Sequence, residues 1–544
     1  MKTKFDHPKR NNSLPIRRDL WLLFGLALLI RLLTALPLQQ PGYMDASYYY
    51  VNAINLAEGR GFVEDFVWHY LDAPAPPPRP SHLYWMPLTS VLAWLGMFIG
   101  GDTFWAAQMP FVLLSAALTV VGYQAALALG GARRHGWLAG LMVIFSGFYF
   151  PYWTTTDNFT PFALFGSLAL LLAARSPENN PLPGNRGRES PQVTGGGKII
   201  SIPAPLPLFA AGVCAGLAHL SWADGVLLLV AVGGWVLFRR RSFGAVLALV
   251  GGYLLVMMPW FVRNWQVTGS LLSAAGTKTI WLASYDDLFS YGRELSAATF
   301  LAQGLGPILQ GRWWAFTINL QTVLAVWGMI VLTPLALLGG WRRRRQPLVQ
   351  LAGLYAALLF TAMTLVFAFP GARGGLFHSG GALLPVIAAL AGLGLDDAVN
   401  WAAARRRGWH AATAQRVFGI GLVVMAVALS SFIYYGRVIK NNSWNNADRS
   451  YVAVAAWVNQ TDPEATVMIN NPPGYRYQGG GLSVVVPNAK LSLVLEAARK
   501  YGVDYLILDK NHPASLAELY ANPTGQPEFK LVKQFGQTLI FQLE

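Results

Sequence analysis

The chain has 544 residues, of which 54% are hydrophobic and only 12% are charged. Soluble domains carry about 25% charged residues, so this composition excludes an ordinary soluble protein and indicates a membrane protein. The net charge of +15 suggests nucleic-acid binding, but basic residues in short clusters between apolar spans would mark the cytoplasmic side of a membrane instead.

The first apolar segment covers residues 19–38 and follows the basic stretch 1–18. About 20 helical residues cross a bilayer core of about 30 Å. The run is longer than a signal-peptide core and further apolar segments follow, so an uncleaved anchor is favoured. Arg31 lies inside this segment. A charge within a span indicates either a function or a buried partner such as Asp157 or Asp224.

Ten more apolar segments predict a mostly α-helical polytopic protein with about eleven transmembrane helices. They lie near 104–130, 136–153, 158–174, 206–222, 224–238, 243–262, 316–340, 347–368, 378–399 and 415–436. The shorter segment 87–100 predicts a helix at the membrane interface.

The basic clusters decide the predicted orientation. With a cytoplasmic N-terminus, all of them fall on the cytoplasmic side: Arg133-Arg134, 175–198, 239–241, 342–345 and 405–407. This agreement supports a multi-pass protein of the cell membrane and removes the nucleic-acid interpretation.

Two long loops, 39–103 and 263–315, are then expected outside, and function is expected on that face. The cytoplasmic stretch 176–205 is rich in Pro, Gly, Asn and Ser and predicts a flexible linker. We therefore predict a transmembrane domain over 1–436.

The remaining residues, 437–544, predict a small α/β domain outside the membrane. Short apolar runs at 467–469, 484–486 and 505–508 indicate strands, and 489–501 has helical spacing before Gly502. Residues 529–543 predict a closing hairpin around Gly536.

The stretch Gly42 to Tyr50 contains Asp45, the first acidic residue after the first span. Residues 45–58 have helical character, so Asp45 is expected near a helix N-terminus. There it is either a helix cap or a catalytic base, and the two roles are compatible because a helix N-terminus keeps a carboxylate ionised.

Several motifs together resemble the polytopic C-type glycosyltransferases, with protein O-mannosyltransferases and bacterial lipid A aminoarabinose transferases closest in pattern. They are the acidic residue before the Tyr-rich helix, Trp85-Met86-Pro87-Leu88, 216–225, Pro259 to Trp265, 371–385 and 501–508. The chain departs from the pattern where Ala46 follows Asp45 and where His82 is displaced from the aromatic-Pro-Leu element.

The resemblance implies transfer of a sugar from a polyprenyl-phosphate donor to an acceptor hydroxyl, with inversion at the anomeric carbon. The acceptor would be a lipid, glycan or protein, and Asp45 matches the position of the base. Arginines suit the leaving phosphate. Arg263 is the first candidate, with snorkelling to the interface as its alternative; Arg373, His378 and Arg79 are the others.

Four more residues are candidates for acceptor binding or support. Asp157 could position the acceptor or cap a helix, and Tyr84 fits an interfacial aromatic belt as well as a site. His219 and Asp224 flank an outer turn and could join Asp157 around a metal. Their loose spacing is poor evidence for one, so we predict no obligatory metal, although a divalent metal is compatible with the set.

Two other functions fit the same bulk properties. A transporter or flippase would show an internal repeat and several charges within its spans, whereas Arg31 is the main such charge here. A non-catalytic protein of envelope assembly would keep the fold without the activity.

Overall fold

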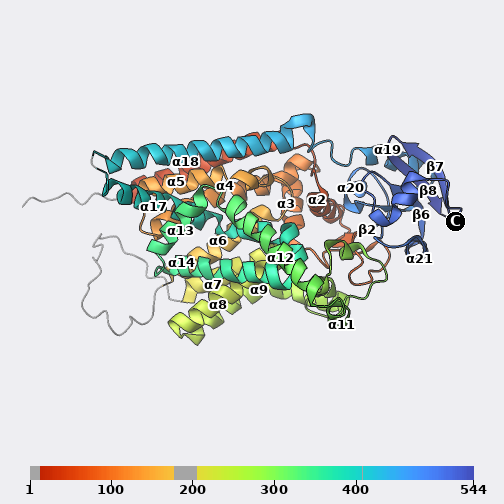
Figure 1. Cartoon of the computed structure of the whole chain (residues 1–544), viewed down its shortest axis with the longest axis horizontal. Helices are drawn as coiled ribbons and strands as arrows, with labels where there is room; N and C mark the ends of the chain where they lie inside the picture. Colours follow the sequence, from red (N-terminus) through yellow and green to blue (C-terminus); the bar gives the residue numbers. More distant parts are fainter. Residues whose placement is uncertain (1–12, 177–204, 407, 544) are drawn as a thin grey trace, which may run out of the picture.

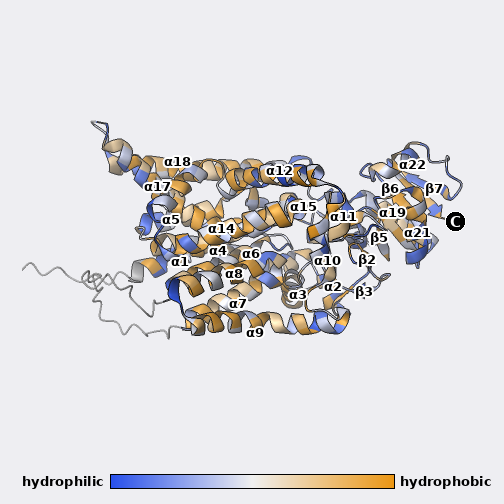
Figure 2. Cartoon of the chain, turned by 60° about the horizontal axis from the view of Figure 1, so that its bottom comes forward, coloured by the Kyte–Doolittle hydropathy of each residue, from blue (hydrophilic) through white to orange (hydrophobic). Residues whose placement is uncertain are grey.

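The computed structural model describes residues 13–176, 205–406 and 408–543. The predicted linker 176–205 therefore lies almost wholly outside the described residues. The molecule is elongated, with a helical bundle at one end and a domain that contains a β-sheet at the other (Figure 1). The bundle helices consist largely of apolar residues (Figure 2). Many large apolar side chains on them are exposed, such as Leu255, Val424 and Phe432, as expected for contact with lipid.

The bundle is built from twelve main helices in the described part of the chain. They are α1 (Ser13–Ala35), α4 (Phe104–Ala128), α5 (Arg133–Ile144), α6 (Phe159–Arg175), α7 (Pro205–Ser221), α8 (Val226–Trp235), α9 (Phe243–Thr268), α12 (Leu305–Gln321), α13 (Leu332–Arg342), α14 (Pro347–Thr361), α17 (Leu384–Ala403) and α18 (Ala411–Tyr434). This architecture confirms a mostly α-helical membrane protein.

Five helices among the described residues are long and apolar enough to cross a membrane, and a sixth is obtained if the bent pair α12 and α13 is one span. That pair bends by 87°, where Met329 and Ile330 adopt positive φ. The expected span at 136–153 is also shorter, because α5 ends at Ile144 and a 3-10 turn, η1 (Gly147–Tyr152), follows. The number of eleven spans stays a prediction.

Arg31 is fully buried within the bundle. Its guanidinium donates to the carbonyls of Val143 (3.3 Å) and Ile144 (2.9 Å), which end α5. These are the carbonyls that a helix C-terminus leaves without intrahelical donors, and they favour a cation. Arg31 thus pairs with a helix end, and neither Asp157 nor Asp224 is its partner in the structure.

Both expected outer loops lie at the end of the bundle that carries the sheet domain (Figure 1). Their elements are α2 (Met44–Ala57), β1 (Val63–Glu64), β2 (Phe66–Val67), β3 (Arg79–Pro80), α3 (Leu88–Gly100), α10 (Ala274–Lys278) and α11 (Ala297–Leu301). Ion pairs such as Arg133–Asp19 and Arg343–Asp397 lie in or beside the predicted cytoplasmic clusters.

The C-terminal domain folds around a six-stranded mixed sheet in the order β2-β5-β4-β6-β8-β7. The strands contributed by the tail are β4 (Thr466–Ile469), β5 (Ser483–Val485), β6 (Val503–Leu508), β7 (Phe529–Phe535) and β8 (Thr538–Leu543). Its helices are α19 (Ser450–Thr461), α20 (Pro472–Tyr477), α21 (Leu491–Tyr501) and α22 (Ala517–Ala521). The small α/β domain is therefore confirmed.

One strand of this sheet, β2, comes from the first outer loop, where no strand was expected. It pairs in parallel with β5, with Phe66 opposite Ser483. The preceding residue, Asp65, forms ion pairs with Arg60 of the loop (2.5 Å) and Arg476 of the tail (3.0 Å). The tail is thus joined to the loop that carries α2, and the domain boundary at residue 437 stays a prediction.

Helix α2 is held between the bundle and the tail. The rings of Tyr48, Tyr49 and Tyr50 are all buried. Tyr48 packs edge-on against Trp85 (4.7 Å between centroids), and Tyr50 packs against Tyr477 of α20 (5.8 Å). Interlocking aromatic pairs of this kind fix a helix in place, so the N-terminal turn of α2 has a defined direction.

Candidate active site

A cavity of about 400 Å³ lies where α2, the outer ends of the bundle helices and the start of the tail meet. Its wall combines one acidic residue, two arginines, a histidine and five other aromatic residues. The lining residues are Gly42, Tyr43, Asp45, Tyr152, Phe159, Arg373, Gly374, Phe377, His378, Arg437, Ser443 and Trp444, and Asp157 lies immediately behind Tyr43 and Asp45.

Asp45 is in the first turn of α2 but does not cap it. The N-cap position is Tyr43, which has extended backbone angles and no side-chain capping bond. The Asp45 carboxylate forms no hydrogen bond with another described residue, and the side chain is half-buried at the cavity wall. The carboxylate therefore keeps its lone pairs for a substrate, while the helix N-terminus favours its charge.

Asp157 is fully buried between η1 and α6. Its two oxygens accept hydrogen bonds from the Tyr43 hydroxyl (2.5 Å) and the Asn158 backbone N–H (2.6 Å). The expected cap position of α6 is taken by Asn158 instead. Both bonds stabilise the ionised form of Asp157.

His378 belongs to the short helix α16 (Leu376–Gly380). Its ring is stacked between Phe159 (3.8 Å between centroids) and Trp222 (4.9 Å). The Nδ1 atom lies 2.5 Å from the Asn158 side-chain oxygen, and the Asn158 amide nitrogen donates to the Tyr49 hydroxyl (3.3 Å). With this assignment Nδ1 carries the proton and Nε2 presents a lone pair.

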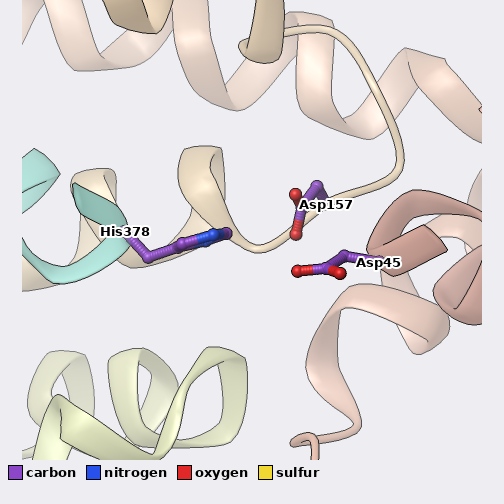
Figure 3. A group of neighbouring side chains, drawn as sticks. All are labelled: Asp45, Asp157 and His378. Atoms are coloured by element: carbon purple, nitrogen blue, oxygen red, sulfur yellow. The ribbon is translucent and has the colours of Figure 1, made fainter. Parts of the chain in front are cut away.

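The two carboxylates and the imidazole meet at one point. Ligand atoms of Asp45, Asp157 and His378 all lie within 4.8 Å of one another, and Figure 3 shows the three side chains pointing toward a common space. They come from three distant parts of the sequence, namely the first outer loop, the turn before α6 and the segment after α14.

The electrostatics of the two carboxylates differ. Burial first, and then the charge of Asp157, raise the pKa of Asp45. Burial also raises the pKa of Asp157, but the hydrogen bonds from Tyr43 and Asn158 oppose that rise. Two like charges this close share a proton, and the bonding pattern places it on Asp45.

Two arginines complete the cavity. Arg373 lies in a π-helical turn, η8 (Gly371–Gly375), and Arg437 lies in another, η10 (Tyr435–Ile439), directly after α18. Both side chains are exposed, and neither forms an ion pair with a described carboxylate. The Arg373 guanidinium lies 5.2 Å from the centre of the Tyr285 ring, which belongs to the second outer loop.

Two predicted phosphate ligands lie away from this cavity. Arg263 donates to the Ser81 carbonyl (2.8 Å) and stacks on Trp260, with 4.6 Å to the ring centroid. Arg79 is buried and pairs with Glu64 at 2.9 Å, beside the short β1–β3 ladder. Both arginines contact the first outer loop, whereas Arg373 and His378 line the cavity.

The predicted supporting residues Asp224, Tyr84 and His219 do not line the cavity. Asp224 accepts from Ser379 (2.6 Å) and from the Trp222 indole (3.0 Å), and so it holds the ring that stacks on His378. Tyr84 packs against Trp68 (5.0 Å). His219 is buried in α7 and bonded to Tyr253 (2.6 Å), so it does not join Asp157 and Asp224.

Sequence reasoning missed four residues of the site: Tyr43, Asn158, Arg437 and Trp444. Arg437 had a usable signal, because it stands at the outer end of an apolar segment in the same way as Arg263. Asn158 had none, since its side chain bonds to Tyr49 and His378, which lie about one hundred and more than two hundred positions away in the chain.

The cluster of Asp45, Asp157 and His378 fits a divalent cation by its donor set. Two carboxylate oxygens and an imidazole nitrogen are suitable ligands. The bond from His378 Nδ1 to Asn158 is the outer contact that a metal-bound histidine normally makes. The aspartates would supply the negative charge, and the cation would supply charge stabilisation to a bound phosphate.

Structural comparison finds solved proteins with the same fold. The Archaeoglobus fulgidus oligosaccharyltransferase tethered with an acceptor peptide has a TM-score of 0.58 at 13% identity, over 90% of this chain and 69% of its own. ArnT from Cupriavidus metallidurans bound to undecaprenyl phosphate has a TM-score of 0.52 at 14% identity, over 96% and 97%.

The same Archaeoglobus fulgidus enzyme in complex with Zn and sulfate has a TM-score of 0.55 at 14% identity, over 95% of this chain and 72% of its own. No protein-family model matches the chain, and no curated protein matches it by sequence. The fold is that of the C-type glycosyltransferases, as the sequence motifs predicted.

Proposed function

We propose that this protein with a C-type glycosyltransferase fold is a membrane glycosyltransferase that takes a sugar from a polyprenyl phosphate. The acceptor is a hydroxyl of a lipid, glycan or protein on the outer face. The observation that carries the proposal is one cavity in which Asp45, free of side-chain partners among the described residues, faces two arginines without carboxylate partners. The structural neighbours, described with an acceptor peptide and with undecaprenyl phosphate, support this substrate class.

In the proposed reaction the acceptor oxygen attacks the anomeric carbon while the bond from that carbon to the phosphate oxygen breaks. The bonding electron pair leaves with the lipid phosphate, and the hydroxyl proton passes to Asp45. Attack opposite the leaving group inverts the anomeric centre. Asp45 is suited to this role because its raised pKa makes it a stronger base than an ordinary carboxylate.

Arg373 is proposed to stabilise the phosphate as it leaves. It is exposed at the cavity and forms no ion pair with a described residue. A guanidinium can donate two parallel hydrogen bonds to phosphate oxygens, and charge that develops during bond breaking increases their strength. Asp157, held by Tyr43 and Asn158, keeps the shared proton on Asp45 in the resting site. The charges of Arg373 and Arg437, and that of a divalent cation if one were bound by the two aspartates and His378, would favour the ionised form of Asp45 that accepts the hydroxyl proton.

The test is sugar transfer by Asp45→Asn in membranes supplied with a panel of polyprenyl-phosphate monosaccharides. Loss of general-base catalysis costs about 10²- to 10⁴-fold in rate, so transfer should fall by at least about 100-fold while membrane insertion is unchanged. Asp102→Asn is the matched control, because Asp102 is exposed in the same outer loop and does not line the cavity. Unchanged transfer by Asp45→Asn would exclude Asp45 as the base.

The same panel separates the other two functions. A parent protein that moves the polyprenyl phosphate between leaflets without any sugar transfer would be a flippase. A parent protein with neither activity, but with a defined envelope partner, would be a non-catalytic assembly factor. We expect the parent protein to transfer sugar. We also expect its N-terminus in the cytoplasm and its C-terminal domain on the outer side of the membrane.

A further inference from the structure

We propose that Arg437, at the outer end of α18, binds the phosphate of the lipid donor together with Arg373, and that the lipid chain leaves the cavity along the face of α18 that carries Phe432. This inference rests on the proposed function and assigns the lipid side of the same site. The ligand is a phosphate group attached to a long apolar chain.

The first observation is the unusual state of the two cavity arginines. Four other arginines near the outer face are neutralised by a carboxylate, in the pairs Arg60–Asp65, Arg79–Glu64, Arg293–Asp287 and Arg476–Asp65. Arg373 and Arg437 form no such pair with a described residue, although Asp45 lines the same cavity. Unpaired guanidinium groups that line one small cavity indicate an anion between them.

The second observation is where the two arginines come from. Arg373 belongs to η8, between α14 and α17, and Arg437 belongs to η10, where α18 meets the linker to the tail. Because both side chains line one cavity of about 400 Å³, a phosphate bound by both would bridge these two segments. Asp45 and His378 line the same cavity, and we expect the sugar and the acceptor hydroxyl to meet beside them.

The third observation is the exposed apolar surface around Arg437, formed by the end of α18 and by η10. Phe432 is 76% exposed, Tyr435 is 56% exposed and Ile439 is 46% exposed. A π-helical turn places a residue about five positions after the one beneath it, so Phe432 lies one turn below Arg437. An exposed aromatic side chain at this depth contacts lipid. A phosphate held by Arg437 therefore starts its chain beside an apolar surface that continues into the bilayer.

Binding of a short-chain polyprenyl phosphate to the purified full-length protein tests the first part. A hydrogen bond to a charged group contributes about 1.5–3 kcal/mol, which corresponds to about 10- to 100-fold in affinity. Arg437→Ala should weaken binding by that factor, and Arg437→Lys should restore part of it. Arg449→Ala is the control, because Arg449 bonds Asn446 and lies outside the cavity.

The outcomes separate this inference from the proposed function. If the parent does not bind the polyprenyl phosphate at all, the proposed donor class is wrong. If the parent binds and Arg373→Ala weakens binding, but Arg437→Ala binds as tightly as the parent, only the present inference fails. Inorganic phosphate that binds as tightly as the lipid phosphate would overturn the assignment of a lipid ligand.

Photo-cross-linking tests the path of the chain without removing Arg437. A benzophenone amino acid in place of Phe432 should cross-link to the labelled short-chain lipid, and unlabelled lipid should compete. The same group in place of Phe418, which is 46% exposed on α18 but about 21 Å away along the helix, should cross-link much less. Equal labelling at both positions would refute the path, as would labelling at Phe432 that unlabelled lipid does not reduce.

Discussion

The hydroxyl of Tyr43 offers a sensitive test of how the two carboxylates share a proton. Tyr43→Phe removes the donor to Asp157 and keeps the ring. The ring packs against Tyr152 (5.8 Å between centroids) and Trp444 (5.5 Å), and Phe preserves these contacts. The substitution therefore changes the electrostatics of Asp157 without opening the cavity wall.

The expected magnitude follows from the lost bond. A hydrogen bond to an ionised group contributes about 1.5–3 kcal/mol, and each pKa unit corresponds to about 1.4 kcal/mol. The pKa of Asp157 should thus rise by about 1–2 units. Asp157 then competes for the proton that burial and the Asp157 charge place on Asp45 in the parent.

The rate of sugar transfer should depend on the ionisation of Asp45. A base works in its unprotonated form, and burial together with Asp157 raises the pKa of Asp45 to about 8. In the parent, kcat/KM for sugar transfer should therefore fall as the pH falls below that value. In Tyr43→Phe the proton is shared more evenly between the two carboxylates, so a larger fraction of Asp45 is ionised at a given acid pH and activity should persist further into the acid range.

The assay is the pH dependence of kcat/KM in purified protein, measured beside Tyr152→Phe. Tyr152 lines the same cavity, and its hydroxyl makes no hydrogen bond to a described residue. An acid limb in Tyr43→Phe that coincides with those of the parent and of Tyr152→Phe would refute proton sharing. A limb that moves to higher pH would indicate that transfer requires both carboxylates to be ionised.

Three further predictions concern the surroundings of the cavity. Gly42 has φ +86°, and an added Cβ would come within 2.3 Å of the Trp444 indole nitrogen. Gly42→Ala should therefore raise KM and lower Tm by more than the control Gly59→Ala, because Gly59 has a similar φ of +75° but no neighbour within 4 Å. Equal effects of the two substitutions would show that the Trp444 contact is unimportant. Asp65→Ala leaves Arg60 and Arg476, both partly exposed, without their carboxylate. The substitution should destabilise the junction between the first outer loop and the tail by about 1–2 kcal/mol, and a protease should then cut the tail faster than in the parent. Proteolysis at the parent rate would mean that the pairing of β2 with β5 alone holds the junction. Chelation with EDTA should leave sugar transfer in place because the arginines stabilise the phosphate, and loss of transfer that Mn²⁺ restores would make the cation obligatory.

The sequence alone determined the class of the protein and the place of its catalytic candidate. Low charge content and basic clusters between apolar segments are properties of the local chain, and the bilayer imposes them directly. Asp45 was selected as a candidate because a helix start and an acidic residue near the end of a span are also local features. The strands and the helix of the tail could be predicted for the same reason, because the apolar pattern that indicates each of them lies within a few consecutive residues.

The tertiary structure decided which residues share the cavity. The sequence favoured Arg263 over Arg373 as the phosphate ligand, yet Arg263 is occupied by the Ser81 carbonyl and Arg373 lines the cavity. Strand β2 pairs with a strand of the tail more than 400 positions away. Because β2 has only two residues, it is too short to show a strand periodicity in the sequence. Contacts made by packing and hydrogen bonds between distant segments leave no trace in local sequence, and the site around Asp45 is built from them.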